Sequence, residues 1–170
     1  MGDVVAKATE PALAAFKLAW WRERLEELDA GKVPAEPRLQ SAADELLSRS
    51  VSGASLAQLE DGWAALLEAD PDPERVAVRG EKMFRLASSL LGISDPGIEL
   101  AGRFHSLVRL GHRPPLPREL EGYVFPRALR PLSALAALAV RDVRRPTAEP
   151  EGTPGRALAL LRHRLTGRIG

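Results

Sequence analysis

Hydrophobic residues recur along this chain every three or four positions, in separate stretches divided by proline, glycine and aspartate. Such spacing places them on one face of an α-helix, as for Leu56, Leu59 and Trp63. We therefore predict helices over about residues 11–30, 38–49, 55–67, 74–91, 97–110, 131–145 and 155–166. The segment 118–129 has no decisive pattern.

Several of these helices have a recognisable start. Asp72 and Asp95 each precede a proline, and their carboxylates are suited to accept hydrogen bonds from the first free backbone amides. Ser55, with Gln58 three residues later, forms a capping box that predicts a start near Ser55. The loops between helices are predicted at 31–37, 111–117 and 147–155, where proline and glycine gather.

The first predicted helix carries hydrophobic side chains on two adjacent sides. At about 100° per residue, one side holds Leu13, Phe16 and Trp20, and the next holds Leu18, Trp21, Leu25 and Leu28. We expect such a helix to touch two neighbours. The large members of a single core are then predicted to be Phe16, Trp20, Trp21, Leu25, Trp63, Phe84 and Leu86.

The composition favours one compact, all-α domain over residues 1–170. Hydrophobic residues make up 45% of the 170, which is too many for a disordered chain and enough for a core. Alanine and leucine are frequent and β-branched residues few, so helix is favoured over sheet. The absence of cysteine excludes disulfides and thiolate metal sites. The longest apolar run, 132–140, is far shorter than a membrane span, and no signal peptide follows Met1, so we expect a soluble, cytoplasmic protein.

Acidic and basic residues are unevenly distributed, although the net charge is only +1. Residues 1–101 hold 18 acidic against 11 basic side chains, and residues 102–170 hold 5 against 13. The interpretation that we favour is that the two halves compensate each other. The alternatives are an anionic ligand such as a diphosphate, an anionic membrane surface and nucleic acid, of which we expect nucleic acid not to be a partner.

The last predicted helix, 155–166, is amphipathic and basic. Leu158, Leu161 and Leu165 share one face, and Arg162 and Arg164 lie outside it. We expect this helix to dock on the acidic half of the chain, with weak contact to an anionic membrane as the alternative, which would make the protein peripheral to the membrane. Further arginines nearby complete a basic C-terminal stretch: Arg141, Arg144, Arg145 and Arg156.

The segment with two adjacent tryptophans resembles a known family. Residues 17–23 read KLAWWRE and are followed by a glycine- and proline-containing loop at 31–37. This segment is similar to the most specific motif of the squalene/phytoene synthase family. Further matches follow in the same order: Gly80 with Phe84-Arg85-Leu86, Gly102, and Leu116-Pro117. The resemblance spans roughly residues 3–165.

Proteins of that family are all-helical, and the active members join two prenyl diphosphates head to head with magnesium held by two aspartate-rich helices. The resemblance therefore implies a truncated helical bundle of the isoprenoid-synthase type. It also implies substrate contacts at Trp20, Trp21, Arg22 and Phe84. The alternatives are that the tryptophans only fill the core and that Arg22 forms an ion pair with a neighbouring acid.

Neither aspartate-rich motif is visible in this chain. Upstream of the double tryptophan the one aspartate is Asp3, and residues 104–112 contain no carboxylate, with His112 about where an aspartate is expected. Diphosphate transfer needs such carboxylates, because they hold the hard cations that neutralise the leaving group. We identify no metal-ligating residues and expect magnesium only together with a bound prenyl diphosphate.

Two functional hypotheses follow from this pattern. The first is a squalene/phytoene-synthase-like protein, related to head-to-head prenyl diphosphate condensation and impaired or inactive alone, that still binds an isoprenoid diphosphate. The second is a non-catalytic helical interaction or assembly factor that binds a partner protein.

Overall fold

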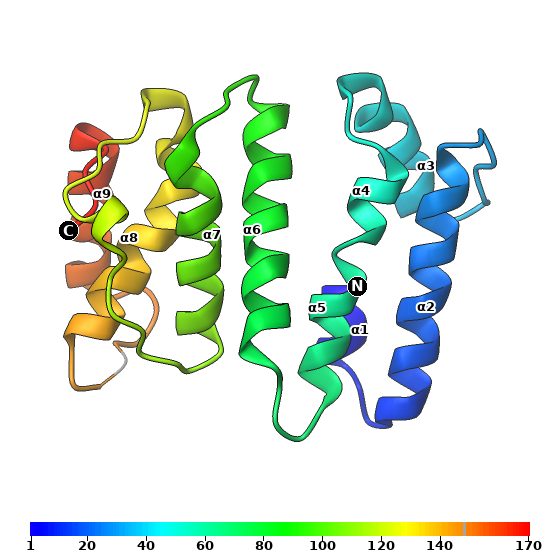
Figure 1. The fold of residues 1–170 in the computed structure, drawn as a ribbon, viewed down its shortest axis with the longest axis horizontal. Helices are drawn as coiled ribbons and strands as arrows, with labels where there is room; N and C mark the ends of the chain where they lie inside the picture. Colours follow the sequence, from blue (N-terminus) through cyan, green and yellow to red (C-terminus); the bar gives the residue numbers. More distant parts are fainter. Residues whose placement is uncertain (148) are drawn as a thin grey trace. The chain divides into compact units, whose positions relative to one another are not determined.

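The computed structural model describes residues 1–147 and 149–170. Among these residues the only extended pairing is an isolated bridge between Val124 and Arg168. The prediction of an all-α fold is therefore confirmed, while the isoprenoid-synthase type stays a prediction. The α-helices (Figure 1) are α1 (Gly2–Ala6), α2 (Pro11–Leu28), α3 (Pro37–Glu45), α4 (Gly53–Ala57), α5 (Glu60–Ala64), α6 (Pro73–Leu90), α7 (Pro96–Arg109), α8 (Arg130–Arg144) and α9 (Pro154–Thr166).

The predicted starts at aspartate are confirmed, and the one at Ser55 is not. Asp72 accepts a hydrogen bond from the amide of Glu74 at 2.8 Å, and Asp95 accepts one from Gly97 at 2.9 Å. The helix predicted over 55–67 instead begins at Gly53, because Ser52 provides the cap. It is divided into α4, α5 and the 3₁₀ turn η2 (Ala65–Leu67).

Short 3₁₀ turns occupy two further places. The predicted helix 38–49 ends early, at α3, and continues as η1 (Leu47–Arg49). The undecided segment 118–129 holds η3 (Arg118–Leu120) and η4 (Arg127–Leu129), with the bridging residue Val124 between them.

The chain divides into two compact units, unit 1 (Met1–Arg79) and unit 2 (Gly80–Gly170). The boundary falls within α6, whose 18 residues belong partly to each unit. Each unit has its own cluster of buried hydrophobic residues. The single core predicted from the sequence is therefore wrong, because Leu25 and Phe84 belong to different clusters.

Unit 1 is organised around one face of α2. That face buries Ala14, Leu18, Leu25 and Leu28, and α2 packs chiefly against α4. The two helices approach closely because position 53 is glycine: a Cβ there would clash with the carbonyl oxygen of Leu25. Asp29, which follows α2, accepts hydrogen bonds from the amides of Gly53 and Ala54 at 2.6 and 2.8 Å and so holds the start of α4 in place.

The other apolar side of α2 lies in contact with solvent. Phe16 is 73% exposed and Trp20 is 38% exposed, so the prediction that both are core residues is wrong. Trp21 does pack against the cluster of unit 1. Trp63 is half-buried, and the guanidinium of Arg79 lies 4.0 Å from the centroid of its ring. Of the two apolar sides predicted for this helix, only one is buried in α2.

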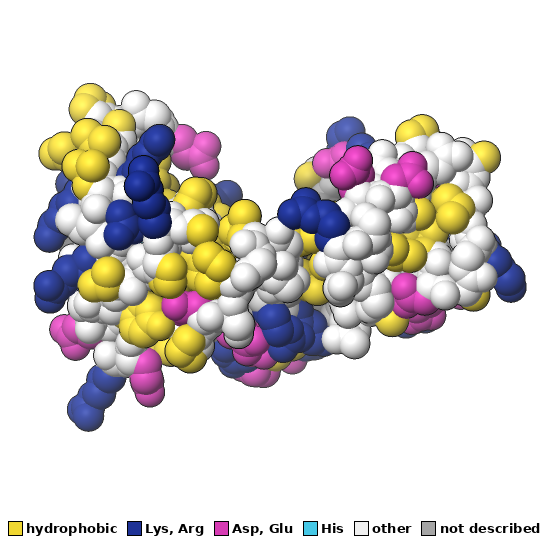
Figure 2. All heavy atoms as spheres, turned by 90° about the horizontal axis from the view of Figure 1, so that it is seen from above, with side chains coloured by type: hydrophobic (Ala, Val, Ile, Leu, Met, Phe, Trp, Pro, Cys, Tyr) yellow, Lys and Arg dark blue, Asp and Glu magenta, His cyan; other side chains and the backbone are white. Residues whose placement is uncertain are grey.

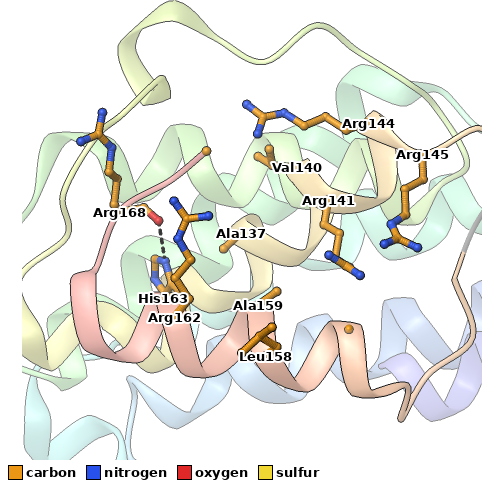
Figure 3. A pocket seen from close by; sticks show the side chains of 12 residues that line it. Ala137, Val140, Arg141, Arg144, Arg145, Leu158, Ala159, Arg162, His163 and Arg168 are labelled. Atoms are coloured by element: carbon orange, nitrogen blue, oxygen red, sulfur yellow. Dashed lines mark hydrogen bonds between the residues drawn. The ribbon is translucent and has the colours of Figure 1, made fainter.

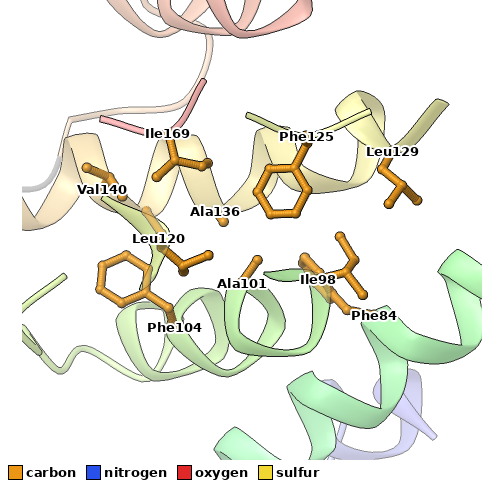
Figure 4. Close-up of a cluster of buried hydrophobic side chains, with 11 residues drawn as sticks. Phe84, Ile98, Ala101, Phe104, Leu120, Phe125, Leu129, Ala136, Val140 and Ile169 are labelled. Carbon is orange, nitrogen blue, oxygen red and sulfur yellow. The ribbon is translucent and has the colours of Figure 1, made fainter. Parts of the chain in front are cut away.

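Unit 2 packs α7 against α8 and α8 against α9. Within this unit, α6 and α7 cross with Gly80 against Gly102, and a Cβ at either glycine would clash with the backbone of the other. The buried cluster draws on helices and connecting segments alike (Figure 4). Its members are Phe84, Ile98, Ala101, Phe104, Leu120, Phe125, Leu129, Ala136, Ala139, Val140 and Ile169.

No helix in the described part of the chain combines the length and the apolar character needed to cross a bilayer.

Candidate functional site

Three of the four predicted substrate contacts follow one another on α2. The rings of Trp20 and Trp21 meet edge to face, with centroids 5.3 Å apart. Trp20 is exposed, whereas Trp21 is half-buried against the cluster of unit 1. Arg22 lies 3.8 Å from the carboxylate of Glu60, which is the ion pair that the sequence left open as an alternative.

Phe84, the fourth predicted contact, lies in the core of unit 2. Its side chain is fully buried, and its ring lies 5.8 Å from that of His105 between centroids. The role of all four residues as substrate contacts stays a prediction.

An arginine-lined pocket of about 370 Å³ lies between α8 and α9 in unit 2 (Figure 3). α8 turns Ala136, Ala139 and Val140 toward the core, which leaves the end of the helix to present arginines to the pocket. The hydroxyl of Thr153 caps the start of α9 by accepting a hydrogen bond from the amide of Arg156, and Gly167 caps its end. The arginines that line the pocket are Arg141, Arg144, Arg145, Arg162 and Arg168.

Gly167 turns the chain back so that Arg168 reaches the pocket. Its φ of 71° lies in the left-handed region, which glycine adopts without strain. The turn is also crowded, because a Cβ at this position would come within 2.7 Å of Nε of Arg130. The sequence analysis placed the other four arginines in a basic stretch but missed Arg168. The glycine directly after an amphipathic helix could have indicated that the chain turns back there.

Two of the five arginines share one carboxylate, that of Glu149. Nε of Arg141 lies 2.7 Å from Oε2 of Glu149, and Arg145 lies 3.5 Å from it. Thr153 also donates a hydrogen bond to Glu149, at 2.8 Å. The hydrogen bond from Arg141 and, after it, that from Thr153 lower the pKa of Glu149 to about 2, so this carboxylate is ionised at neutral pH.

The other three arginines, Arg144, Arg162 and Arg168, have no acidic partner within residues 1–147 and 149–170. Each of these guanidinium groups carries a positive charge. Because arginine presents several N–H donors in one plane, such groups match carboxylate and phosphate oxygens well. The pocket thus carries a surplus of positive charge and of hydrogen-bond donors.

His163 holds Arg168 in position from beneath the pocket. It is buried, and burial lowers its pKa below the ordinary value for histidine, so the ring is neutral at pH 7. Nδ1 lies 3.0 Å from the backbone carbonyl of Arg168, which only accepts hydrogen bonds, so Nδ1 carries the proton. The Ser133 hydroxyl then donates to Nε2 at 2.8 Å.

Four small or aliphatic side chains also line the pocket: Ala137, Val140, Leu158 and Ala159. The cavity is within the size range of small-molecule sites. Its lining can accept an anionic headgroup beside the first part of a hydrocarbon chain. Arg156, which the sequence grouped with the pocket arginines, instead forms an ion pair with Asp142.

Among the described residues no group of three or more histidine, aspartate or glutamate side chains is placed to hold a metal ion. His112, at the position where the family resemblance leads one to expect an aspartate, is exposed just beyond α7.

Comparison with known proteins adds no relative. No family model matches the chain, and neither a curated protein nor a solved structure does. The resemblance to the squalene/phytoene synthase family therefore stays a prediction that depends on the residues quoted above.

Proposed function

We propose that this chain is a squalene/phytoene-synthase-like binding protein that holds an anionic amphiphile, such as an isoprenoid diphosphate, in the arginine-lined pocket of unit 2. On this proposal it binds the ligand without condensing two of them. The observation that carries the proposal is the set of three arginines, Arg144, Arg162 and Arg168, that face one pocket without an acidic partner among the described residues.

Charge and shape both support this ligand class. A diphosphate brings several oxygens that accept hydrogen bonds, and arginine binds phosphate with paired donors. The aliphatic side chains of Val140 and Leu158 lie in the same lining, where the first carbons of a prenyl chain would remove apolar surface from water. The resemblance of residues 17–23 to the family motif supports an isoprenoid as the hydrocarbon part.

Thermal unfolding with farnesyl diphosphate and magnesium tests the proposal. A ligand at 100 times its dissociation constant stabilises a protein by about 2.7 kcal/mol, so we expect the melting temperature to rise by several degrees. Farnesol, which lacks the diphosphate, should leave it unchanged. The double variant Arg144→Ala, Arg168→Ala should lose the response.

The matched control is Arg127→Ala, which removes an exposed arginine of η4 that does not line this pocket. It should keep the full response. If the wild type does not respond, or if the Arg144→Ala, Arg168→Ala variant responds as strongly as the control, the pocket is not the binding site.

One observation favours the second candidate, a non-catalytic interaction or assembly factor. Leu13, Phe16 and Trp20 form an exposed apolar stripe along α2, and aromatic residues of this kind are enriched in protein–protein contacts. If the chain is such a factor, farnesyl diphosphate should not change its melting temperature. The same thermal experiment therefore separates the two candidate functions.

A further inference from the structure

The outer face of α9 is an exposed stripe of leucines. Leu158, Leu161 and Leu165 follow at helical spacing and are 66%, 53% and 70% exposed. The opposite side of the helix is the one that packs into unit 2, since it buries His163. More than half of each side chain is exposed, so no other part of the described chain covers the stripe, although Leu158 also borders the arginine-lined pocket.

Arginines lie on both sides of this stripe. At about 100° per residue, Arg162 lies beside one edge of the stripe and Arg164 beside the other. Both are exposed, and α9 contains no acidic residue. At the left end of Figure 2, which holds unit 2, hydrophobic and basic side chains lie next to one another on the surface.

We infer that α9 lies on an anionic lipid bilayer surface, with its leucines in the boundary between headgroups and acyl chains and with Arg164 at the lipid phosphates, while Arg162, at the other edge of the stripe, also lines the pocket. An aliphatic stripe with arginines along its edges is the pattern of helices that lie in the membrane interface. Arginine suits this position because its stem stays in the apolar region while its charged group reaches the phosphates. Without acidic residues, α9 meets no repulsion from a negative surface.

The composition of the stripe distinguishes a membrane from a protein partner. Protein interfaces are enriched in tyrosine, tryptophan and phenylalanine, and α9 contains none of these. With 13 residues α9 is also too short to span a bilayer, so it lies on the surface rather than across it. The contact is weak, because one helix inserts three leucines, and it depends on salt.

Vesicle flotation tests this inference. We expect the wild type to float with phosphatidylcholine vesicles that contain phosphatidylglycerol at low salt, at least threefold less at high salt, and not with pure phosphatidylcholine. The variant Leu161→Gln, Leu165→Gln should lose flotation, and Arg164→Glu should weaken it. The control Phe16→Gln, an exposed apolar residue on α2, should float like the wild type.

The changed residues are exposed and do not line the arginine pocket, so the melting temperature and its response to farnesyl diphosphate should persist in the Leu161→Gln, Leu165→Gln variant. Failure of the pocket proposal therefore leaves this test intact. A Leu161→Trp variant gives a second measurement, since brominated acyl chains should quench its added fluorescence.

Three results would overturn the inference: no flotation of the wild type, equal flotation on neutral and anionic vesicles, or flotation unaffected by the leucine substitutions. If the protein binds inorganic phosphate but does not bind vesicles, the arginines serve a free anion rather than a lipid headgroup. Binding to polyglutamate but not to vesicles would assign α9 to an acidic polypeptide.

Discussion

At the scale of single residues, His163 links the stability of unit 2 to pH. Its imidazole is buried between Ser133 and the carbonyl of Arg168, and burial lowers its pKa below the ordinary value of about 6.5. The positive charge of Arg130 acts in the same direction. Protonation would remove the acceptor that Ser133 uses and place a further positive charge near that of Arg130.

The direction of the pH effect follows from proton binding. Below about pH 6.5 the unfolded chain takes up a proton at this histidine while the folded chain resists it. The stabilisation from neutral His163 is therefore complete above that pH and is lost as the pH falls through the lower, folded pKa. We expect the melting temperature to fall more steeply from pH 8 to pH 5 in the wild type than in His163→Gln.

His105 and His112 are present in both proteins of that comparison, so the difference between the two curves isolates position 163. Parallel curves would contradict the prediction.

The single-residue scale is also where sequence reasoning was least accurate. Phe16 and Trp20 were predicted to be buried because of their side chains and spacing, yet both lie in contact with solvent. Periodicity indicates which residues share a face, but not whether another element covers that face. Arg168 was missed for a related reason: its position depends on the turn at Gly167 and on the hydrogen bond from His163.

At the scale of elements, α2 allows a direct comparison of two adjacent tryptophans. Trp21 packs against the cluster of unit 1, whereas Trp20 is on the exposed stripe. We expect Trp21→Ala to lower the free energy of unfolding by about 3 kcal/mol, at the low end for a large buried residue because Trp21 is only half-buried. Trp20→Ala should cost less than about 1 kcal/mol.

Chemical denaturation of the two variants measures this difference, and each serves as the other's control. Equal losses would mean that both rings are buried in solution.

Helix positions were largely predictable, and their exact boundaries depended on contacts that a local pattern does not contain. The aspartate caps at Asp72 and Asp95 are local, and both were predicted correctly. The start of α4 was not predicted correctly: the local cap is Ser52 rather than Ser55, and Asp29, 24 residues before Gly53 in the sequence, also binds the amide of Gly53.

At the scale of the whole molecule, the resemblance and the residues present lead to one prediction about chemistry. No carboxylate set among the described residues is placed to hold the magnesium ions of a condensing enzyme. We expect the chain alone, incubated with farnesyl diphosphate or geranylgeranyl diphosphate and magnesium, to release no more pyrophosphate than a heat-inactivated sample. Release well above that background would imply metal ligands that the geometry does not reveal.

The fold class was readable from composition and periodicity, but the division into two units was not. The spacing of hydrophobic residues indicates that a segment is helical but not which other helices it packs against. For this reason the sequence analysis predicted one core where the structure has two buried clusters. The charge pattern was equally ambiguous. Arg141, Arg145 and Arg156 find their partners in Glu149 and Asp142, which belong to the same basic stretch, while compensation between the two halves stays a prediction.

The crossing of α6 and α7 at Gly80 and Gly102 has a consequence for mutational tolerance. Side-chain contacts can be repacked after a substitution, but here backbone faces backbone, so a larger residue at either position must push the two helices apart. The same distance, that between the backbones of α6 and α7 at this point, therefore constrains both glycines. Once the first has been replaced and the helices have separated, replacing the second should cost little more. The variant with alanine at both positions should therefore be only slightly less stable than either single alanine variant, so the two costs should not add.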